Sequence, residues 1–174
     1  MRGERHGGPA RGALPVVDRQ PWSDAVDAAL AAHRDTPGGL LPILHAIQAT
    51  VGHVPPAAVP VIADALNLSR ADVHGVVSFY HDFRDRPAGR HVIKVCRAEA
   101  CQSVGAEALV AHACRQLGVA LHGTAADGSI TLDPVYCLGN CALAPAVQVD
   151  GTVHGRVTPA MFDALVQGLR GGTA

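Results

Sequence analysis

The sequence predicts an α+β protein in which a small helical bundle is followed by an α/β domain. Three observations support this prediction. Apolar residues recur at helical spacing in short runs between residues 22 and 83. From residue 91 to residue 174, β-branched segments alternate with helical ones. The stretch DFRDRPAGR, residues 82–90, is charged and turn-prone, so we place a linker at residues 84–90.

The predicted bundle consists of short amphipathic helices joined by brief loops. The first helix is expected to begin with Ser23 as its cap, and the second to begin near Pro42 and stop at Gly52. The third is expected to begin around Pro56, because proline is tolerated in the first turn of a helix. The sequence SRAD, residues 69–72, has the form of a capping box and predicts the start of the fourth helix.

The second domain is expected to follow the order strand, helix, strand, hairpin, helix, which is the layout of a thioredoxin-type domain. Its first helix is expected to begin with Ser103 as its cap and to end before Gly118, and its last helix to begin with Thr158 as its cap. Its strands are predicted at residues 91–96, 129–137, 146–150 and 152–157.

Composition and charge exclude several function classes. The chain has 174 residues, a formal net charge of −1 and a pI of about 6.8, so it has no overall basic field for nucleic acid or anionic lipid. No apolar run reaches the length of a membrane-spanning helix. Residues 1–21 lack the apolar centre of a secretory signal and are expected to be a flexible N-terminal segment of a cytoplasmic protein. Because no Ser-His-Asp set, Walker loop or G-x-G-x-x-G motif was found, we expect no catalytic site in the isolated chain.

Four of the five cysteines form two spaced pairs. Cys96 and Cys101 have C-x4-C spacing, and Cys137 and Cys141 have C-x3-C spacing. Each pair follows a predicted strand, and if these strands are parallel neighbours, both pairs meet at one edge of the sheet. Cys114 instead falls on the apolar stripe of a predicted helix, where a free cysteine acts as a small hydrophobe.

Two thiolate pairs on adjacent loops suit the two irons of a binuclear iron-sulfur cluster, with one pair per iron. Gly139 can adopt a positive φ and bring amide hydrogens close to sulfur. Cys101 is expected just before a helix N-terminus, which favours the thiolate. The x4 and x3 spacings permit a structural zinc site without favouring it, and the C-x-x-C motif usual in a thiol redox site is absent, so both remain alternatives. Apolar neighbours are expected to limit solvent access, namely Ala98, Ala100, Leu138, Ala142 and Leu143.

These motifs resemble a known family. The C-x4-C pair, followed by the C-x3-C pair inside VYCLGNCALAPAVQVDG, is similar to the thioredoxin-like 2Fe-2S subunit found beside the flavin and NAD-binding subunit of NADH dehydrogenase modules. The upstream helical region, which includes GVVSFYHDF, is similar to the same family, so the resemblance covers roughly residues 36–170. Within the family, VCRAEACQ and VDGTVHGRVTP look most similar to the gamma subunit of the soluble, molybdenum-containing, NAD-dependent formate dehydrogenase.

The resemblance implies one 2Fe-2S cluster held by Cys96, Cys101, Cys137 and Cys141, and an electron-transfer role next to a flavin. It places FMN, NAD and the molybdenum cofactor on partner chains, a flavin/NAD-binding beta subunit and a molybdenum/iron-sulfur alpha subunit. The equivalent subunit of an NADH:quinone oxidoreductase or of an NAD-reducing hydrogenase is one alternative. A zinc- or thiol-based interaction domain is an alternative of another class.

Two further expectations concern the regions beside the cysteines and the linker. Thioredoxin folds often have a cis proline beside the active loop, so a cis peptide bond is expected at Ala144-Pro145. The aromatic residues Phe79, Tyr80 and Phe83 lie near the predicted junction. They are expected either to form a docking surface or to seal the two domains together.

Overall fold

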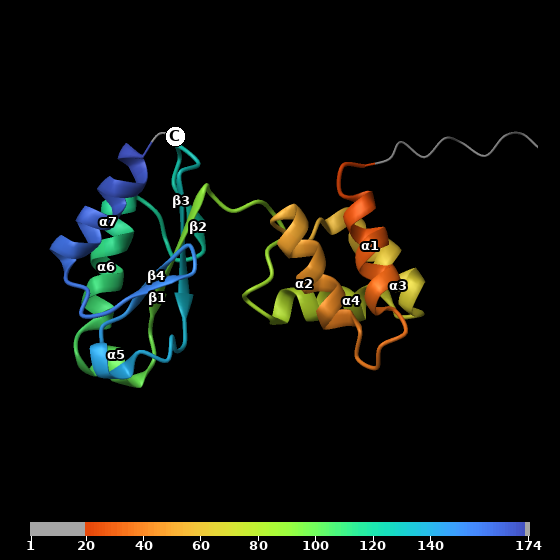
Figure 1. Cartoon of the computed structure of the whole chain (residues 1–174), viewed down its shortest axis with the longest axis horizontal. Coiled ribbons are helices and arrows are strands. Elements are labelled where there is room, and N and C mark those ends of the chain that lie inside the picture. Colours follow the sequence, from red (N-terminus) through yellow and green to blue (C-terminus); the bar gives the residue numbers. More distant parts are fainter. Residues whose placement is uncertain (1–19, 173–174) are drawn as a thin grey trace, which may run out of the picture.

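The computed structural model describes residues 20–172. The N-terminal segment predicted at residues 1–21 therefore lies outside the described residues, except for its last two positions. The remainder forms a group of helices followed by a sheet with helices on one face (Figure 1). In the described part of the chain, no helix has the length and apolar character needed to cross a membrane.

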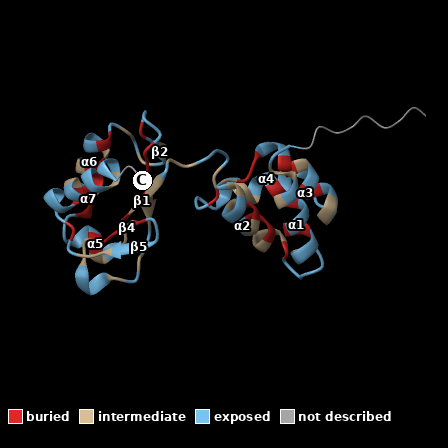
Figure 2. Ribbon diagram, turned by 45° about the horizontal axis from the view of Figure 1, so that its top comes forward, coloured by how far each residue is buried: buried red, intermediate tan, exposed pale blue. Residues whose placement is uncertain are grey.

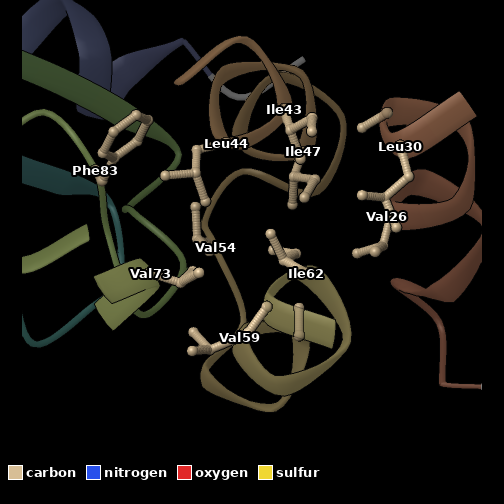
Figure 3. Close-up of a cluster of buried hydrophobic side chains, with 13 residues drawn as sticks. Val26, Leu30, Ile43, Leu44, Ile47, Val54, Val59, Ile62, Val73 and Phe83 are labelled. Carbon is tan, nitrogen blue, oxygen red and sulfur yellow. The ribbon is translucent and has the colours of Figure 1, made fainter. Parts of the chain in front are cut away.

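The helical bundle has its own hydrophobic core. Its helices are α1 (Ser23–His33), α2 (Leu40–Val51), α3 (Val59–Leu66) and α4 (Arg70–Phe79), with a 3-10 turn at Pro56–Ala58 before α3. Ile43, Leu44 and Ile47 of α2 are fully buried against Ile62 of α3 (Figure 3). Burial of apolar side chains of this kind stabilises the fold by about 1.5–3 kcal/mol per residue.

Two of the predicted helix boundaries in the bundle are confirmed. The Ser69 side chain accepts a hydrogen bond from the Asp72 N–H at 3.0 Å, and an Asp72 carboxylate oxygen accepts one from the Ser69 N–H at 3.1 Å, which completes the capping box. Gly52 has φ of 85° and ends α2. The prediction for Ser23 is wrong, because Ser23 is already the first residue of α1, Trp22 is at the N-cap position, and no side chain caps the helix.

The sheet has the order β2-β3-β1-β4-β5 within residues 20–172. Strands β1 (His91–Cys96) and β3 (Ile130–Val135) are parallel, as predicted, and Cys96 lies opposite Val135. Strands β4 (Val147–Val149) and β5 (Thr152–His154) form the predicted hairpin. The edge strand β2 (Gly123–Thr124) was not predicted, because two residues are too few to show a periodic pattern.

Helices α6 (Ala106–Leu117) and α7 (Pro159–Gly171) lie on one face of the sheet (Figure 1). Figure 2 shows that buried positions gather between these helices and the strands, and separately where the bundle helices face one another. Thr158 caps α7 as predicted, with its hydroxyl accepting from the Met161 N–H at 3.2 Å. Ser103 does not cap a helix, because it is the last residue of the short helix α5 (Glu99–Ser103) and Gly105 precedes α6.

The segment between α4 and β1 is bonded to both parts of the chain. On the bundle side, the Arg84 N–H donates to Gln48 Oε1 at 2.8 Å, and the Val54 N–H donates to the Arg84 carbonyl at 2.8 Å. On the sheet side, the Arg84 guanidinium pairs with Asp133 of β3. Lys94 Nζ of β1 pairs with Asp82 at 2.6 Å. These contacts connect the bundle to the sheet through the intervening segment.

The aromatic residues near this junction have different environments. Phe83 is buried in the bundle core and packs against His45, with ring centroids 4.8 Å apart. Phe79 and Tyr80 are exposed, at 73% and 44% of their surface. Phe83 therefore belongs to the interior, whereas Phe79 and Tyr80 remain available at the surface.

Candidate functional site

The candidate site lies at the edge of the sheet where β1 and β3 both end. Cys96 is the last residue of β1, and Cys137 follows β3 after one intervening residue. Because β1 and β3 are parallel and Cys96 lies opposite Val135, the two cysteine segments emerge side by side. The convergence that the cysteine spacing predicted is therefore present in the fold.

Cys96 and Cys101 form a buried pair. Each exposes 3% of its surface, and both pack with Ala106 and Ala146. Burial raises the pKa of the Cys101 thiol, and its interaction with the Cys96 thiol raises that pKa further. A hydrogen bond with the Ala146 backbone acts in the opposite direction. This pair is thus sheltered from water by small apolar side chains.

The expected position of Cys101 before a helix N-terminus is wrong. Cys101 is the third residue of α5, which has only five residues. Its N–H donates to the Ala98 carbonyl at 2.9 Å within that turn. The structure therefore does not support stabilisation of the Cys101 thiolate by the dipole of the following helix. The main influence on the pKa of this thiol is burial, which raises it.

Cys137 and Cys141 form an exposed pair on the loop after β3. The interaction with Cys137 raises the pKa of the Cys141 thiol. The Gly139 N–H donates a hydrogen bond to Cys137 Sγ at 3.3 Å, and Gly139 has φ of 73°, as its predicted role requires. Cys137 itself has φ of 149°, an uncommon conformation for a residue with a side chain, and such conformations cluster at functional sites.

The two pairs also interact with each other. Electrostatic interactions with Cys96 and Cys141 contribute to the raised pKa of Cys101, and Cys96 contributes to that of Cys141. Among residues 20–172, no three His, Cys, Asp or Glu side chains converge tightly enough to hold one metal ion together. The thiols are therefore arranged as two neighbouring pairs rather than as one compact group.

Cys114 is separate from these four. It lies on α6, is half-buried, and packs against the hydrophobic core between the sheet and its helices. This placement agrees with the prediction that Cys114 is a packing residue.

The predicted shielding of the cysteines is only partly correct. Ala98 and Leu138 pack against the buried pair. Ala142 and Leu143 are exposed, because the 3-10 turn Cys141–Leu143 lies on the surface of the loop. Water is thus excluded from the Cys96 and Cys101 side but not from the Cys137 and Cys141 side.

Gly155 was missed by the sequence prediction and holds the cysteine loop in place. A Cβ at Gly155 would lie 2.6 Å from Leu143 Cβ and 2.9 Å from Asn140 Nδ2, so only glycine permits this approach. The Arg156 N–H donates to the Leu143 carbonyl at 2.6 Å beside it. The peptide bond Ala144-Pro145, which leads from this loop into β4, is cis as predicted.

A second missed feature is a polar cluster beside the site. The Arg97 guanidinium makes hydrogen bonds of 2.9 and 3.1 Å to the two carboxylate oxygens of Glu107. Arg97 follows Cys96 directly and also interacts with Tyr136, which precedes Cys137 and is 68% exposed. The sequence pattern did not indicate this cluster, because the contact of Arg97 with Tyr136 depends on the pairing of β1 with β3, and its contact with Glu107 depends on the position of α6.

Comparison with known families and proteins gives consistent matches. Residues 26–170 match the family of thioredoxin-like 2Fe-2S ferredoxins. The E subunit of NADH-quinone oxidoreductase from Pseudomonas aeruginosa is 41% identical over 127 residues, which cover 73% of this chain and 76% of that protein. The HndA subunit of NADP-reducing hydrogenase from Solidesulfovibrio fructosivorans is 38% identical over 122 residues, which cover 70% of this chain and 71% of that protein.

A similar arrangement occurs in a solved structure, the NAD+-reducing NiFe hydrogenase in its H2-reduced state. The TM-score is 0.64 at 25% sequence identity, over 78% of this chain. The match spans only 23% of that hydrogenase chain, so the present chain corresponds to a small part of it. The family match over most of the sequence, together with these relatives, shows that the chain belongs to the thioredoxin-like 2Fe-2S ferredoxin family of electron-transfer proteins, a membership that implies one 2Fe-2S cluster.

Proposed function

We propose that this chain is the electron-transfer subunit of an NADH dehydrogenase-like module and that Cys96, Cys101, Cys137 and Cys141 hold its 2Fe-2S cluster. The observation that supports this proposal is the meeting of two thiol pairs at the shared end of β1 and β3. Such a cluster supplies one-electron uptake and release.

The donor set fits a cluster of this kind. Thiolates are soft ligands that suit iron-sulfur clusters, and the pairwise arrangement matches one pair per iron. The raised pKa of Cys101 and of Cys141 favours the protonated thiols while no positive charge is present. Iron would compensate the charge of the thiolates, so binding would release protons. The Gly139 amide already donates to a cysteine sulfur, as amides around cluster sulfurs do.

The two pairs would have different tasks. Cys96 and Cys101 would hold their side of the site in a dry, apolar environment provided by Ala106 and Ala146. Cys137 and Cys141 would hold the side that a partner protein can approach, because this loop is exposed. Electron exchange is expected on the side of the exposed pair.

The partner that we propose is the flavin/NAD-binding subunit of the same complex. Relatives named as subunits of NADH-quinone oxidoreductase and of NADP-reducing hydrogenase support this part of the proposal. We further propose that the complex is an NAD-dependent formate dehydrogenase with a molybdenum/iron-sulfur alpha subunit. This finer assignment is supported by the segments VCRAEACQ and VDGTVHGRVTP. The equivalent subunit of a quinone oxidoreductase or hydrogenase is the second candidate, favoured by the names of the relatives.

We also propose that residues 22–83 and 91–174 are separate domains joined by a linker at residues 84–90. The buried hydrophobic residues fall into one cluster that ends at Phe83 and others that begin at Ile93, which supports this division.

One preparation tests the central proposal. Purified anaerobically, the protein should be red-brown and contain about two irons and two sulfides per chain. A colourless protein with one zinc per chain would contradict the proposal and support a zinc-stabilised interaction domain. Co-purification with molybdenum and formate-dependent reduction of NAD would support the formate dehydrogenase assignment, whereas quinone or hydrogen chemistry would support the second candidate.

A further inference from the structure

A cleft of about 650 Å³ lies between the helical bundle and the edge of the sheet. Its walls are α4, the segment that follows α4, and residues of β2 and β3. None of the four cysteines proposed as ligands lines the cleft. The function proposed above therefore gives this cleft no role.

One wall of the cleft is a face of α4 with polar and positively charged side chains. Arg70, His74 and Ser78 lie four residues apart along the helix, so they share one face, and all three are exposed. Within residues 20–172, the Arg70 side chain has no ion-pair or hydrogen-bond partner. This face of α4 therefore presents an unpaired guanidinium to the cleft.

The opposite wall contains the free edge of the sheet. Thr124 of the edge strand β2 lines the cleft and lies opposite Thr131 of β3. The next residue, Ala125, donates its N–H to the Ile130 carbonyl at 2.8 Å. Because hydrogen-bonded and non-hydrogen-bonded pairs alternate in antiparallel strands, the backbone N–H and C=O of Thr124 point away from β3. Because β2 has only two residues, an extended segment can form backbone hydrogen bonds with this edge at Thr124.

The charge of the lining favours an acidic occupant. Three arginines and three histidines line the cleft, against two aspartates. Both aspartates are already paired, Asp133 with Arg84 and Asp85 with Arg86. His122 also lies against Asp133, with Nδ1 3.5 Å from a carboxylate oxygen. The positive charge of Arg70 and the ring N–H donors of His74 and His81 thus remain for an anionic partner. Val54, Val59 and Phe83 add an apolar surface to the same cleft.

The N-terminal residues of this chain do not have the complementary charge. Residues 1–19 contain four arginines against one glutamate and one aspartate, so they have the same sign as the lining. An acidic occupant must therefore be sought outside this segment. The contacts that connect the walls, Arg84 with Asp133 and Gln48 with Arg84, form the cleft in the isolated chain, which reduces the ordering cost of binding.

We propose that this cleft binds an extended, acidic segment of the partner subunit, which pairs with the edge at Thr124 and places carboxylates against Arg70. The proposal rests on the proposed function in one respect, the existence of a multi-subunit complex.

A photo-cross-linker placed at Ser78 in the assembled complex identifies the occupant directly. The matched control carries the same cross-linker at Gln167, an exposed position on α7 that does not line the cleft. Mass spectrometry of the Ser78 product should find a partner peptide with an excess of aspartate and glutamate. A product with a second copy of this chain, a product with a peptide that lacks acidic excess, or no product at Ser78 would overturn the proposal.

Charge reversal tests the role of Arg70. Arg70→Glu places an acid in the first turn of α4, where the helix tolerates it, so the variant should fold. Its affinity for the flavin/NAD subunit should fall by about tenfold or more and become less dependent on salt. The control Arg115→Glu, at an exposed position of α6 that does not line the cleft, should change the affinity by less than about twofold.

The visible spectrum of each preparation separates this proposal from the proposed function. A wild-type protein without a cluster would refute the proposed function, whatever the affinities are. A cluster-containing Arg70→Glu variant that binds the partner as tightly as the wild type would refute the cleft proposal alone.

Discussion

Substitution of Gly155 by alanine tests whether the cysteine loop depends on a close backbone approach. The added Cβ would lie 2.6 Å from Leu143 Cβ and 2.8 Å from the Leu143 carbonyl oxygen, well inside normal contact distances. Leu143 follows Cys141 by two residues in the same 3-10 turn, so relief of the clash moves the loop of the exposed cysteine pair. Overpacking of this kind costs about 1–3 kcal/mol. Gly155→Ala should therefore lower the stability of the protein and loosen its cluster.

The matched control is Gly168→Ala. Gly168 lies within α7, and an added Cβ there meets nothing within 4 Å. Alanine is favoured over glycine in a helix by about 0.5–1 kcal/mol, so this variant should be slightly more stable than the wild type. Urea unfolding and the rate of cluster bleaching in air measure both effects. If Gly155→Ala unfolds and bleaches like the wild type, the loop does not depend on this approach and the reasoning is refuted.

The remaining predictions concern the ligands, the bundle core and the capping box. Cys101→Ser should lose or destabilise the cluster, while Cys114→Ser should keep its visible spectrum and lose only core stability; equal cluster loss in both would contradict the division between ligand and packing residue. Leu44→Ala, at a fully buried position of the bundle, should cost about 2–5 kcal/mol in calorimetry and leave the cluster spectrum unchanged; coupled loss of the cluster would argue against separate domains. The hydrogen bonds to Ser69 lower the pKa of Asp72 below its ordinary value of 3.8, so their contribution to stability is present above that pH and disappears as the pH falls through the lowered pKa. The stability difference between the wild type and Asp72→Asn should therefore be measurable at neutral pH and shrink in acid, and a difference that grows in acid would contradict it.

Features that depend on residues close in the sequence could be predicted. The capping box at residues 69–72 and the cap at Thr158 are formed by side chains and amides within three residues of each other. The strand at residues 91–96 is continuous and β-branched, and its helical connection favours a parallel neighbour. The convergence of the cysteine pairs follows from these two facts, so the cysteine spacing together with the predicted strands could indicate the candidate ligands.

Features that depend on the path of the backbone in three dimensions could not be predicted. Ser103 has the residue type of a cap, but α5 already includes it, and the turn at Gly105 then starts the next helix. Gly155 matters only because the strand before it returns the chain to lie against the cysteine loop. Arg97 follows β1 and Glu107 lies on α6, and the local sequence does not indicate how these two elements are placed relative to each other.

Strand β3 runs from the cleft, which Asp133 lines, to the loop that carries two of the proposed cluster ligands. Asp133, in the middle of β3, pairs with Arg84 at the cleft, and β3 ends two residues before Cys137 of the exposed pair. Electron transfer requires a partner to approach the exposed pair closely and in one orientation, whereas one contact on a loop leaves the partner free to rotate. A second contact at the cleft, on the same strand, would remove that freedom. The orientation of the bundle through Arg84 and Asp133 would then affect electron transfer even though no bundle residue is proposed to hold the cluster.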